Sequence, residues 1–523
     1  MSTPVTAHAE APVPLKTWLA VIGAMIGAFI AVLNIQITNA SLPDIQGAIG
    51  AGIDDGGWIS TSYLVAEIVV IPLTGFLVPV FSLRRYLLVN AALFLVMSIA
   101  CAFAGNLEQM IALRALQGFF GGVLIPLAFT ITLTMLPRSK QPIGLALFAI
   151  SATFAPAIGP TIGGYLTQTY NWRYIFYVNL VPGLVMLAFL FPTLPAAPMQ
   201  LRRIKDGDWA GIATLAIGLA SLQTVLEEGN KDDWFGSALI VRLTIVSVVA
   251  FALFLWVELT VERPLLNLRL LTRRNFGLGS VSNLILGMAL YGSVFLLPDY
   301  LSQIQGYNSQ QVGEVLAWTG FPQLAIIPFV PWLMQRVDAR LLVTLGLALF
   351  AASCFLNIHI SQDYAADQLL WPNVVRAIGQ SLVMTPLSAL ATGGIERENA
   401  GSASALFNMM RNLGGSIGIA LLQTILTKRE QFHSTVVTAR VSVFNEATQA
   451  RLAQLQQYFE TTGLSDPDTA WHEAVAAIGK SVHTQSTLMA FSDAFYLMGG
   501  AILLALAAAA LMKRTAGSGA GAH

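Results

Sequence analysis

Long apolar segments alternate with short polar ones along almost the whole chain. A helix that crosses a bilayer needs about 20 predominantly apolar residues, and fourteen segments meet that requirement. They lie at 18–42, 57–78, 85–104, 108–135, 141–166, 173–193, 208–226, 237–258, 275–299, 311–332, 340–360, 370–392, 399–425 and 490–512. The pattern therefore predicts an all-α integral membrane protein with fourteen transmembrane helices.

Charged residues are distributed unequally between the two sides of the predicted bundle. An even number of spans places both termini on one side, and the short loops of that side carry most of the Lys and Arg residues. The short loops of the opposite side are richer in Asp and Glu. Because basic loops remain in the cytoplasm, we expect a multi-pass membrane protein with cytoplasmic N- and C-termini.

Composition narrows the possible functions. Charged residues make up only 11% of the chain, against about 25% in soluble domains, and a net charge of zero gives no sign of nucleic-acid binding. Cys101 and Cys354 lie in apolar segments and are expected to be packing residues. The histidines His433, His472 and His483 lack the spacing of metal ligands. With no nucleotide-binding motif or catalytic set in the sequence, we expect no enzyme, no cofactor and no metal site.

Two six-helix blocks repeat weakly within the chain. SLPD (41–44) ends the first helix and LLPD (296–299) ends its counterpart, while Arg114 and Arg376 fall in corresponding helices. Parallel six-helix halves are a transporter architecture, with the substrate site between them near the midplane of the membrane. Chance similarity of Gly- and Arg-containing helices is the alternative.

The repeat predicts six parts of the chain. They are a cytoplasmic tail (1–17), an N-terminal bundle (18–193), a linker with two additional helices (194–262), five helices of the C-terminal bundle (263–425), a periplasmic loop with amphipathic helices (426–489), and the last helix with a cytoplasmic tail (490–523). The two helices of the linker carry little internal polarity, so we expect them to face lipid outside the translocation path.

Polar residues interrupt the first apolar segment in the stretch AVLNIQITNASLP (31–43). Asn34, Thr38 and Ser41 share one helical face by their i, i+4, i+7 spacing. None of them can titrate near neutral pH. We expect this stripe to face a cavity between the two bundles and to offer hydrogen bonds to cargo or to Arg114.

Ionisable residues inside a membrane are costly and mark functional sites. Glu67, Arg114 and Asn34 lie at similar depths and could converge in the N-terminal bundle. Burial favours the protonated form of a carboxyl group, whereas a nearby guanidinium favours the ionised form. Cargo that separates such a pair would release or recruit a proton. Glu67 is therefore the candidate proton carrier, unless it only anchors Arg114 or faces water, and Asp299 is a shallower second candidate.

Several motifs identify a family that the chain resembles. LNIQITNASLP (33–43), RALQG (114–118), GPTIGG (159–164), NWRYIFYVNLVPG (171–183) and QTVLEEGNKDDWF (223–235) match segments of the fourteen-helix drug:proton antiporters of the major facilitator superfamily, EmrB/QacA type. The likeness covers essentially the whole chain.

The chain departs from that family at two motifs. Asn34 stands where the family usually has a helix-1 Asp, which leaves the proton-carrier role open for Glu67. The gating loop between the second and third helices is degraded to GFLVPVFSLRR (75–85), in which Pro79 replaces an Asp. Arg84 and Arg85 remain from that motif.

The resemblance implies a proton-coupled exporter of lipophilic or amphipathic toxic compounds, driven by the proton gradient and located in the bacterial inner membrane. Uptake of a small nutrient or siderophore in the same fold is the alternative. A periplasmic adaptor and an outer-membrane channel are the implied partners, which the loop at 426–489 would contact unless it only folds over the pore as a lid.

The candidate site residues fall into four groups. The proton-coupling candidates are Glu67, Arg114 and Asp299, and the substrate-binding candidates are Asn34, Thr38, Ser41, Gln117, Tyr291, Phe295, Arg376, Phe407 and Arg411. The antiporter motif of the fifth helix comprises Pro156, Gly159, Pro160, Gly163 and Gly164, and the gating loop contributes Gly75, Arg84 and Arg85. Three buried arginines would favour neutral or anionic cargo, unless they pair with backbone carbonyl groups.

Overall fold

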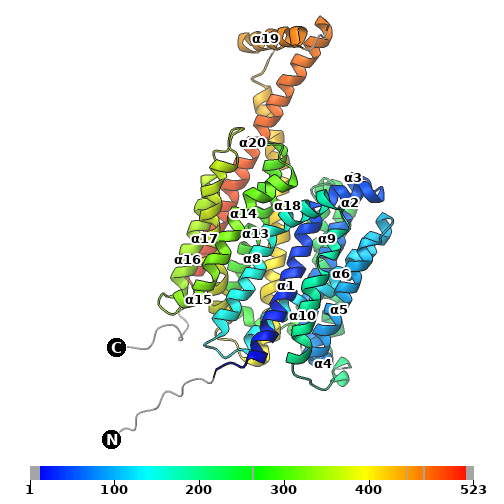
Figure 1. Cartoon of the computed structure of the whole chain (residues 1–523), viewed down its shortest axis with the longest axis vertical. Coiled ribbons are helices and arrows are strands. Elements are labelled where there is room, and N and C mark those ends of the chain that lie inside the picture. The colour runs from blue at the N-terminus through cyan, green and yellow to red at the C-terminus, as the bar shows by residue number, and fades with distance from the viewer. Residues whose placement is uncertain (1–11, 206, 262–263, 443, 463–465, 514–523) are drawn as a thin grey trace.

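The computed structural model describes residues 12–205, 207–261, 264–442, 444–462 and 466–513, and within these it contains helices and no strand. Most of both predicted tails therefore lies outside the described residues. Helix α1 begins and helix α20 ends at the same end of the molecule (Figure 1). We call this end the terminal face and the opposite end the far face.

The helices form two bundles and an insert. The N-terminal bundle contains α1 (Leu15–Ala40), α2 (Leu42–Ile49), α3 (Ile53–Gly56), α4 (Trp58–Phe81), α5 (Leu83–Ala102), α6 (Leu107–Gly121), α7 (Leu124–Met135), α8 (Gln141–Thr169), α9 (Tyr174–Tyr177) and α10 (Leu180–Thr193). The insert contains η1 (Leu201–Ile204), α11 (Trp209–Glu228), η2 (Trp234–Gly236), α12 (Ala238–Thr260) and η3 (Leu268–Thr272). The C-terminal bundle contains α13 (Arg274–Gln303), α14 (Ser309–Ile326), η4 (Ile327–Phe329), α15 (Val330–Leu333), α16 (Ala339–Leu356), α17 (Ala366–Thr392), η5 (Arg397–Asn399), α18 (Ala400–Thr438), α19 (Glu446–Thr462) and α20 (Pro467–Ala510).

The predicted all-α membrane fold is confirmed. Among the described residues, thirteen helical segments are long and apolar enough to span a membrane. The fourteenth predicted span, 399–425, is the first part of α18, which packs against α4, α7, α13 and α20. A helix surrounded by protein can carry polar and small residues that a lipid-facing helix cannot, which explains its low hydropathy.

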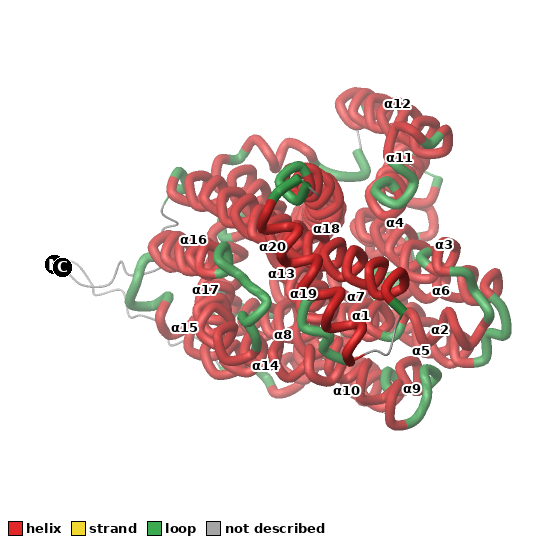
Figure 2. The backbone as a smooth tube through the Cα atoms, turned by 90° about the horizontal axis from the view of Figure 1, so that it is seen from above, coloured by secondary structure: helices red, strands yellow, loops and turns green. Residues whose placement is uncertain are grey.

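The two bundles meet along two pairs of contacts. Helix α8 of the N-terminal bundle packs against α14 and α17, and α18 of the C-terminal bundle packs against α4 and α7. Seen from above, the bundles lie side by side, and the insert stands at one corner next to α4 (Figure 2). This arrangement leaves the space for a site between the halves.

The segment 426–489 contains amphipathic helices as expected, but much of it is a direct continuation of the helices α18 and α20 and not a separate loop. Helix α18 runs through to Thr438, and α20 already begins at Pro467, where Asp466 accepts hydrogen bonds from the backbone N–H groups of the first turn. Together with α19 they form a helical projection beyond the bundles on the far face (Figure 1). Hydropathy marks where an apolar segment ends, but helix propagation needs only backbone hydrogen bonds.

Candidate functional site: a cavity between the bundles

A cavity of about 1150 Å³ lies between the two bundles. Its walls come from α1, α2, α4, α8, α11, α13, α14, α18 and α20, together with connecting segments of the far face. The long helices contribute their far-face halves, as with residues 60–68 of α4 and 291–303 of α13. The cavity therefore opens toward the far face.

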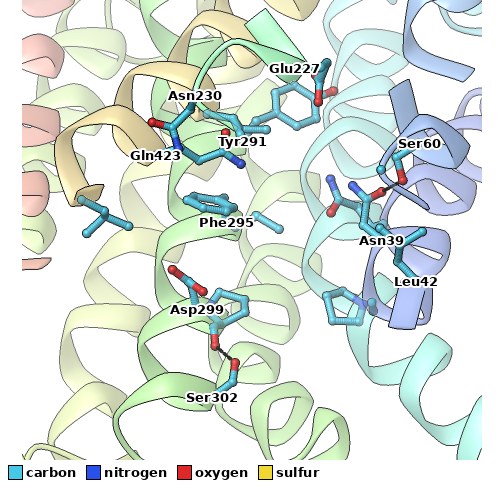
Figure 3. Close-up of a pocket in the computed structure, with 18 of the residues that line it drawn as sticks. Asn39, Leu42, Ser60, Glu227, Asn230, Tyr291, Phe295, Asp299, Ser302 and Gln423 are labelled. Carbon is cyan, nitrogen blue, oxygen red and sulfur yellow. Dashed lines mark hydrogen bonds between the residues drawn. The ribbon is translucent and has the colours of Figure 1, made fainter. Parts of the chain in front are cut away.

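One face of α13 supplies three of the predicted residues. Tyr291, Phe295 and Asp299 follow one another along this helix and line the cavity, opposite Asn39 and Leu42 (Figure 3). The Asp299 carboxylate accepts a hydrogen bond from Gln303 Nε2 at 2.7 Å. An aromatic wall with a carboxylate toward the end of the same helix suits a molecule that is apolar at one end and polar at the other.

Glu67 lies at the deep end of the cavity, where both bundles contribute. It lines the cavity although its side chain is only 2% exposed. Its Oε1 accepts a hydrogen bond of 3.5 Å from Asn412 Nδ2 of α18, in the other bundle. Sequence reasoning placed Glu67 near Arg114 and missed Asn412.

Arg114 instead organises the interior of the N-terminal bundle. Its Nη1 donates to Asn34 Oδ1 at 2.9 Å and to Gln117 Oε1 at 2.7 Å, its Nε donates to Ile59 O, and its guanidinium lies 4.2 Å from the Tyr63 ring centre. Of the two partners expected for Asn34, cargo or Arg114, the structure shows Arg114. Neither residue lines the cavity, and no hydrogen bond joins Arg114 to Glu67 among the described residues.

Replacing Arg114 with Met should destabilise the protein. The side chain is 1% exposed, and its loss would leave the buried oxygens of Asn34 and Gln117 with only the long contacts from Thr38 Oγ1 at 3.4 Å and Cys101 Sγ at 3.7 Å. A buried acceptor that is poorly satisfied costs about 1–3 kcal/mol. We expect a clear fall in the midpoint of thermal unfolding, measured by intrinsic fluorescence in detergent. The same substitution at the exposed Arg85 is the control and should change stability by no more than about 0.5 kcal/mol. Equal midpoints for the two variants would contradict this role.

The polar stripe of α1 does not face the cavity, so that prediction is wrong. Thr38 bonds back to the Asn34 carbonyl at 2.8 Å, and Ser41 Oγ lies 2.7 Å from Thr167 Oγ1 of α8. The residues of α1 that line the cavity are instead Ile35, Gln36, Asn39 and Ala40. Because α1 packs closely on α8 within its own bundle, the stripe is used for internal hydrogen bonds.

The remaining predicted polar residues also lie outside this cavity. Gln117 is fully buried and links Arg114 to Ser98. Arg411 donates to Asn408 Oδ1 at 3.1 Å and lies over the Phe148 ring. Arg376 donates to Thr319 and to the Ser293 carbonyl, beside a separate cavity of about 10 Å³ between the bundles. The cavity is therefore not lined by the three arginines expected to favour anionic cargo.

The glycines of the predicted antiporter motif bring α8 close to α1. A Cβ atom added at Gly159 would lie 2.5 Å from Gln36 Cβ, and one added at Gly163 would lie 2.9 Å from the Ile37 carbonyl oxygen. Gly164 is also buried. Helix α8 continues through both prolines, of which Pro160 lines the main cavity and Pro156 the small one.

The two bundles touch on the terminal side of the cavity. Phe129 of α7 stacks on Phe407 of α18 with ring centres 5.7 Å apart, and Ser404 donates to the Pro126 carbonyl at 2.7 Å. Phe407 was expected to bind substrate, but it is fully buried in this contact and does not line the cavity. Its ring is therefore part of the contact that joins the two bundles on this side.

The predicted gating loop lies closer to the terminal face than the contact between Phe129 and Phe407. A Cβ atom added at Gly75 of α4 would lie 3.9 Å from the Gly401 carbonyl group of α18, so the two backbones approach each other there. Arg84 lies over the Phe191 ring, and Arg85 is exposed. Of the three predicted residues, Gly75 is the one placed at the junction of the bundles.

The insert contributes to the cavity, which the sequence analysis did not expect. Gln223, Glu227 and Glu228 of α11 line it, and Glu228 accepts a hydrogen bond of 2.7 Å from Thr61 of α4. Helix α12 packs on α11, and most of its residues are not buried by protein. The prediction of a lipid-facing insert therefore fits α12 and is wrong for α11. The acidic pair at the end of the α11 segment was the signal that could have revealed this.

The two cysteines are packed in the interior, and two of the histidines contact acidic residues on a neighbouring helix. Cys101 and Cys354 are buried free thiols. His433 lies 2.8 Å from Asp493 Oδ2, and His483 lies 3.0 Å from Glu430 Oε1, so both link α18 to α20 near the far face. Within the described residues, no group of three potential metal ligands occurs.

Comparison with known proteins places this architecture in a family. The family model described as "Major Facilitator Superfamily" matches residues 24–419. The chain is 34% identical to the colistin resistance protein EmrB of Acinetobacter baumannii over 93% of this chain and 94% of that protein. It is 31% identical to the multidrug export protein EmrB of Escherichia coli K12 over 96% of each. The human organic anion transporter MFSD10 has a similar fold, with a TM-score of 0.58 at 15% identity over 95% of this chain and 100% of that one.

Proposed function

The chain belongs to the major facilitator superfamily, as an EmrB-like permease and a secondary transporter rather than an enzyme, and from this premise we propose that it exports lipophilic or amphipathic toxic compounds in exchange for protons. The relatives named as a multidrug export protein and as a colistin resistance protein support the direction and the cargo. The observation that carries the proposal is a cavity open on one face only, with Glu67 at its deep end.

Alternating access requires that the two halves rock about a central site. The cavity is open toward the far face, while the Phe129–Phe407 stack and the Ser404–Pro126 hydrogen bond close the terminal side. Rocking the bundles the other way would break these contacts and expose the same site to the terminal face. Cytoplasmic termini make the present conformation the outward-open one.

Glu67 is the proposed coupling residue. It belongs to one bundle, receives a hydrogen bond from the other, and borders the cargo cavity. A carboxyl group in this position can be protonated from the periplasm while the far face is open. It would release that proton to the cytoplasm after the halves have rocked, when cargo binds and displaces it.

We also propose a periplasmic adaptor and an outer-membrane channel as partners. The helical projection formed by α18, α19 and α20 extends beyond the bundles on the far face (Figure 1), where such an adaptor would meet the permease. Exposed apolar side chains on it, including Phe432, Tyr458 and Trp471, suit a protein contact.

Proteoliposomes with an acidic lumen provide the test. Addition of the lipophilic dye ethidium should dissipate the pH gradient in vesicles that contain the protein and leave it intact in protein-free vesicles, as read by a pH-sensitive fluorophore. In a pump-deficient Gram-negative host, expression should raise resistance to ethidium further when an adaptor is co-expressed. Symport of cargo and proton in the same direction would instead support the uptake alternative and overturn export.

A further inference from the structure

The last two turns of α11 form an oriented hydrogen-bonding group in the cavity wall. Gln223 and Glu227 are four residues apart, on the same helical face, and both line the cavity. Gln223 Nε2 donates to Glu227 Oε1 at 2.9 Å and to Ser416 Oγ of α18 at 2.8 Å. These two bonds occupy both N–H groups of the amide and fix its orientation.

The carbonyl oxygen of that amide is left without a donor. Gln223 is 1% exposed, and its Oε1 has no hydrogen-bond partner among the described residues. A buried acceptor without a donor costs free energy, so such atoms in native proteins call for an explanation. Here a ligand that brings an N–H or O–H group into the cavity would satisfy it.

The charges of the lining restrict which ligand fits. Its acidic side chains are Glu67, Glu227, Glu228, Asp299 and Glu430, of which Glu67 is neutral while it carries the transported proton. Among the described lining residues, Lys231 is the one Lys or Arg side chain, and it pairs with Glu228 at 3.2 Å. An anionic head group would be repelled by this lining, whereas a cationic donor would be attracted and could bond to both Gln223 and Glu227.

We propose that Gln223 and Glu227 bind the protonated amino group of an amphipathic cargo, a subsite supplied by the insert helix α11. The apolar body of the cargo would lie against Tyr291 and Phe295, which line the same cavity. The proposal rests on the proposed function, since it names the cargo class for that cavity. It makes α11 a part of the binding site and Ser416 a positioning residue that holds the Gln223 amide.

Binding to the purified full chain in detergent, without any gradient, tests the subsite separately from transport. The probe is dansylcadaverine, a fluorescent primary amine, compared with its N-acetylated form, which has the same apolar body and no charge. Fluorescence anisotropy gives the dissociation constant of each probe for the wild type, Glu227→Gln and Asp232→Asn. Asp232 is the matched control, because it is an acid that follows α11 and does not line the cavity.

The wild type and Asp232→Asn should bind the amine more tightly than the N-acetylated probe. Glu227→Gln should weaken amine binding about tenfold and leave binding of the N-acetylated probe unchanged. Equal weakening for both probes, unchanged amine binding, or failure of the wild type to prefer the amine would each overturn the subsite. If transport fails in proteoliposomes while this pattern holds, export is wrong and the subsite stands.

Discussion

Replacing Glu67 with Gln is expected to abolish export driven by a pH gradient while leaving cargo exchange intact. The substitution keeps the size of the side chain and its hydrogen bond with Asn412, but it removes the only group at this position that can gain and lose a proton. A transporter whose side chain at position 67 is always neutral can still alternate between its two faces. It can no longer link that movement to proton flow.

Two measurements on the same proteoliposomes separate coupling from general inactivation. Cargo transport into the vesicles that is driven by an imposed pH gradient should fall to background for Glu67→Gln. Exchange of labelled for unlabelled cargo without a gradient should continue at a rate near that of the wild type. Glu108→Gln, an exposed acid in the first turn of α6, should behave as the wild type in both. Full gradient-driven transport by Glu67→Gln would remove Glu67 from the mechanism.

Sequence patterns predicted the large features of the fold because the membrane imposes them. Apolar segments of fixed length specify the spans, and the repeat specifies the two bundles. The contact between Asn34 and Arg114 could also be predicted from the sequence, since two polar groups at similar depth in one bundle must find partners. The glycine spacing at Gly159 and Gly163 predicted a close helix contact, which the structure places between α8 and α1.

Other features depended on which neighbour each helical face meets. Periodicity assigned Asn34, Thr38 and Ser41 to one face, but it could not say whether that face turns to the cavity or to α8. The same limit misplaced Phe407, whose ring meets Phe129 in the other bundle. Helix α11 was misjudged because its first turns are apolar and only its far-face end carries the polar lining.

Joining Gly75 and Gly401 by a disulfide is expected to lock the transporter with its cavity open to the far face. A Cβ atom added at Gly401 would lie 3.9 Å from the Gly75 Cα, and one added at Gly75 would lie 3.9 Å from the Gly401 carbonyl carbon. Cysteines at the two positions therefore come within the reach of a disulfide, whose Cβ atoms are about 3.8 Å apart. Because α4 and α18 belong to different bundles, the bond would prevent them from separating on the terminal side.

Oxidation of the Gly75→Cys, Gly401→Cys double variant should stop transport, and dithiothreitol should restore it. Mass spectrometry of proteolytic peptides would confirm the bond, and each single variant, oxidised in the same way, is the control. The native Cys101 and Cys354 are both buried, so the new pair is the one accessible to a membrane-impermeant oxidant. Because rocking of the halves must separate these two backbones to open the terminal face, full transport by the cross-linked protein would show that the contact does not gate the cavity. Export would then require a path other than the junction of α4 and α18.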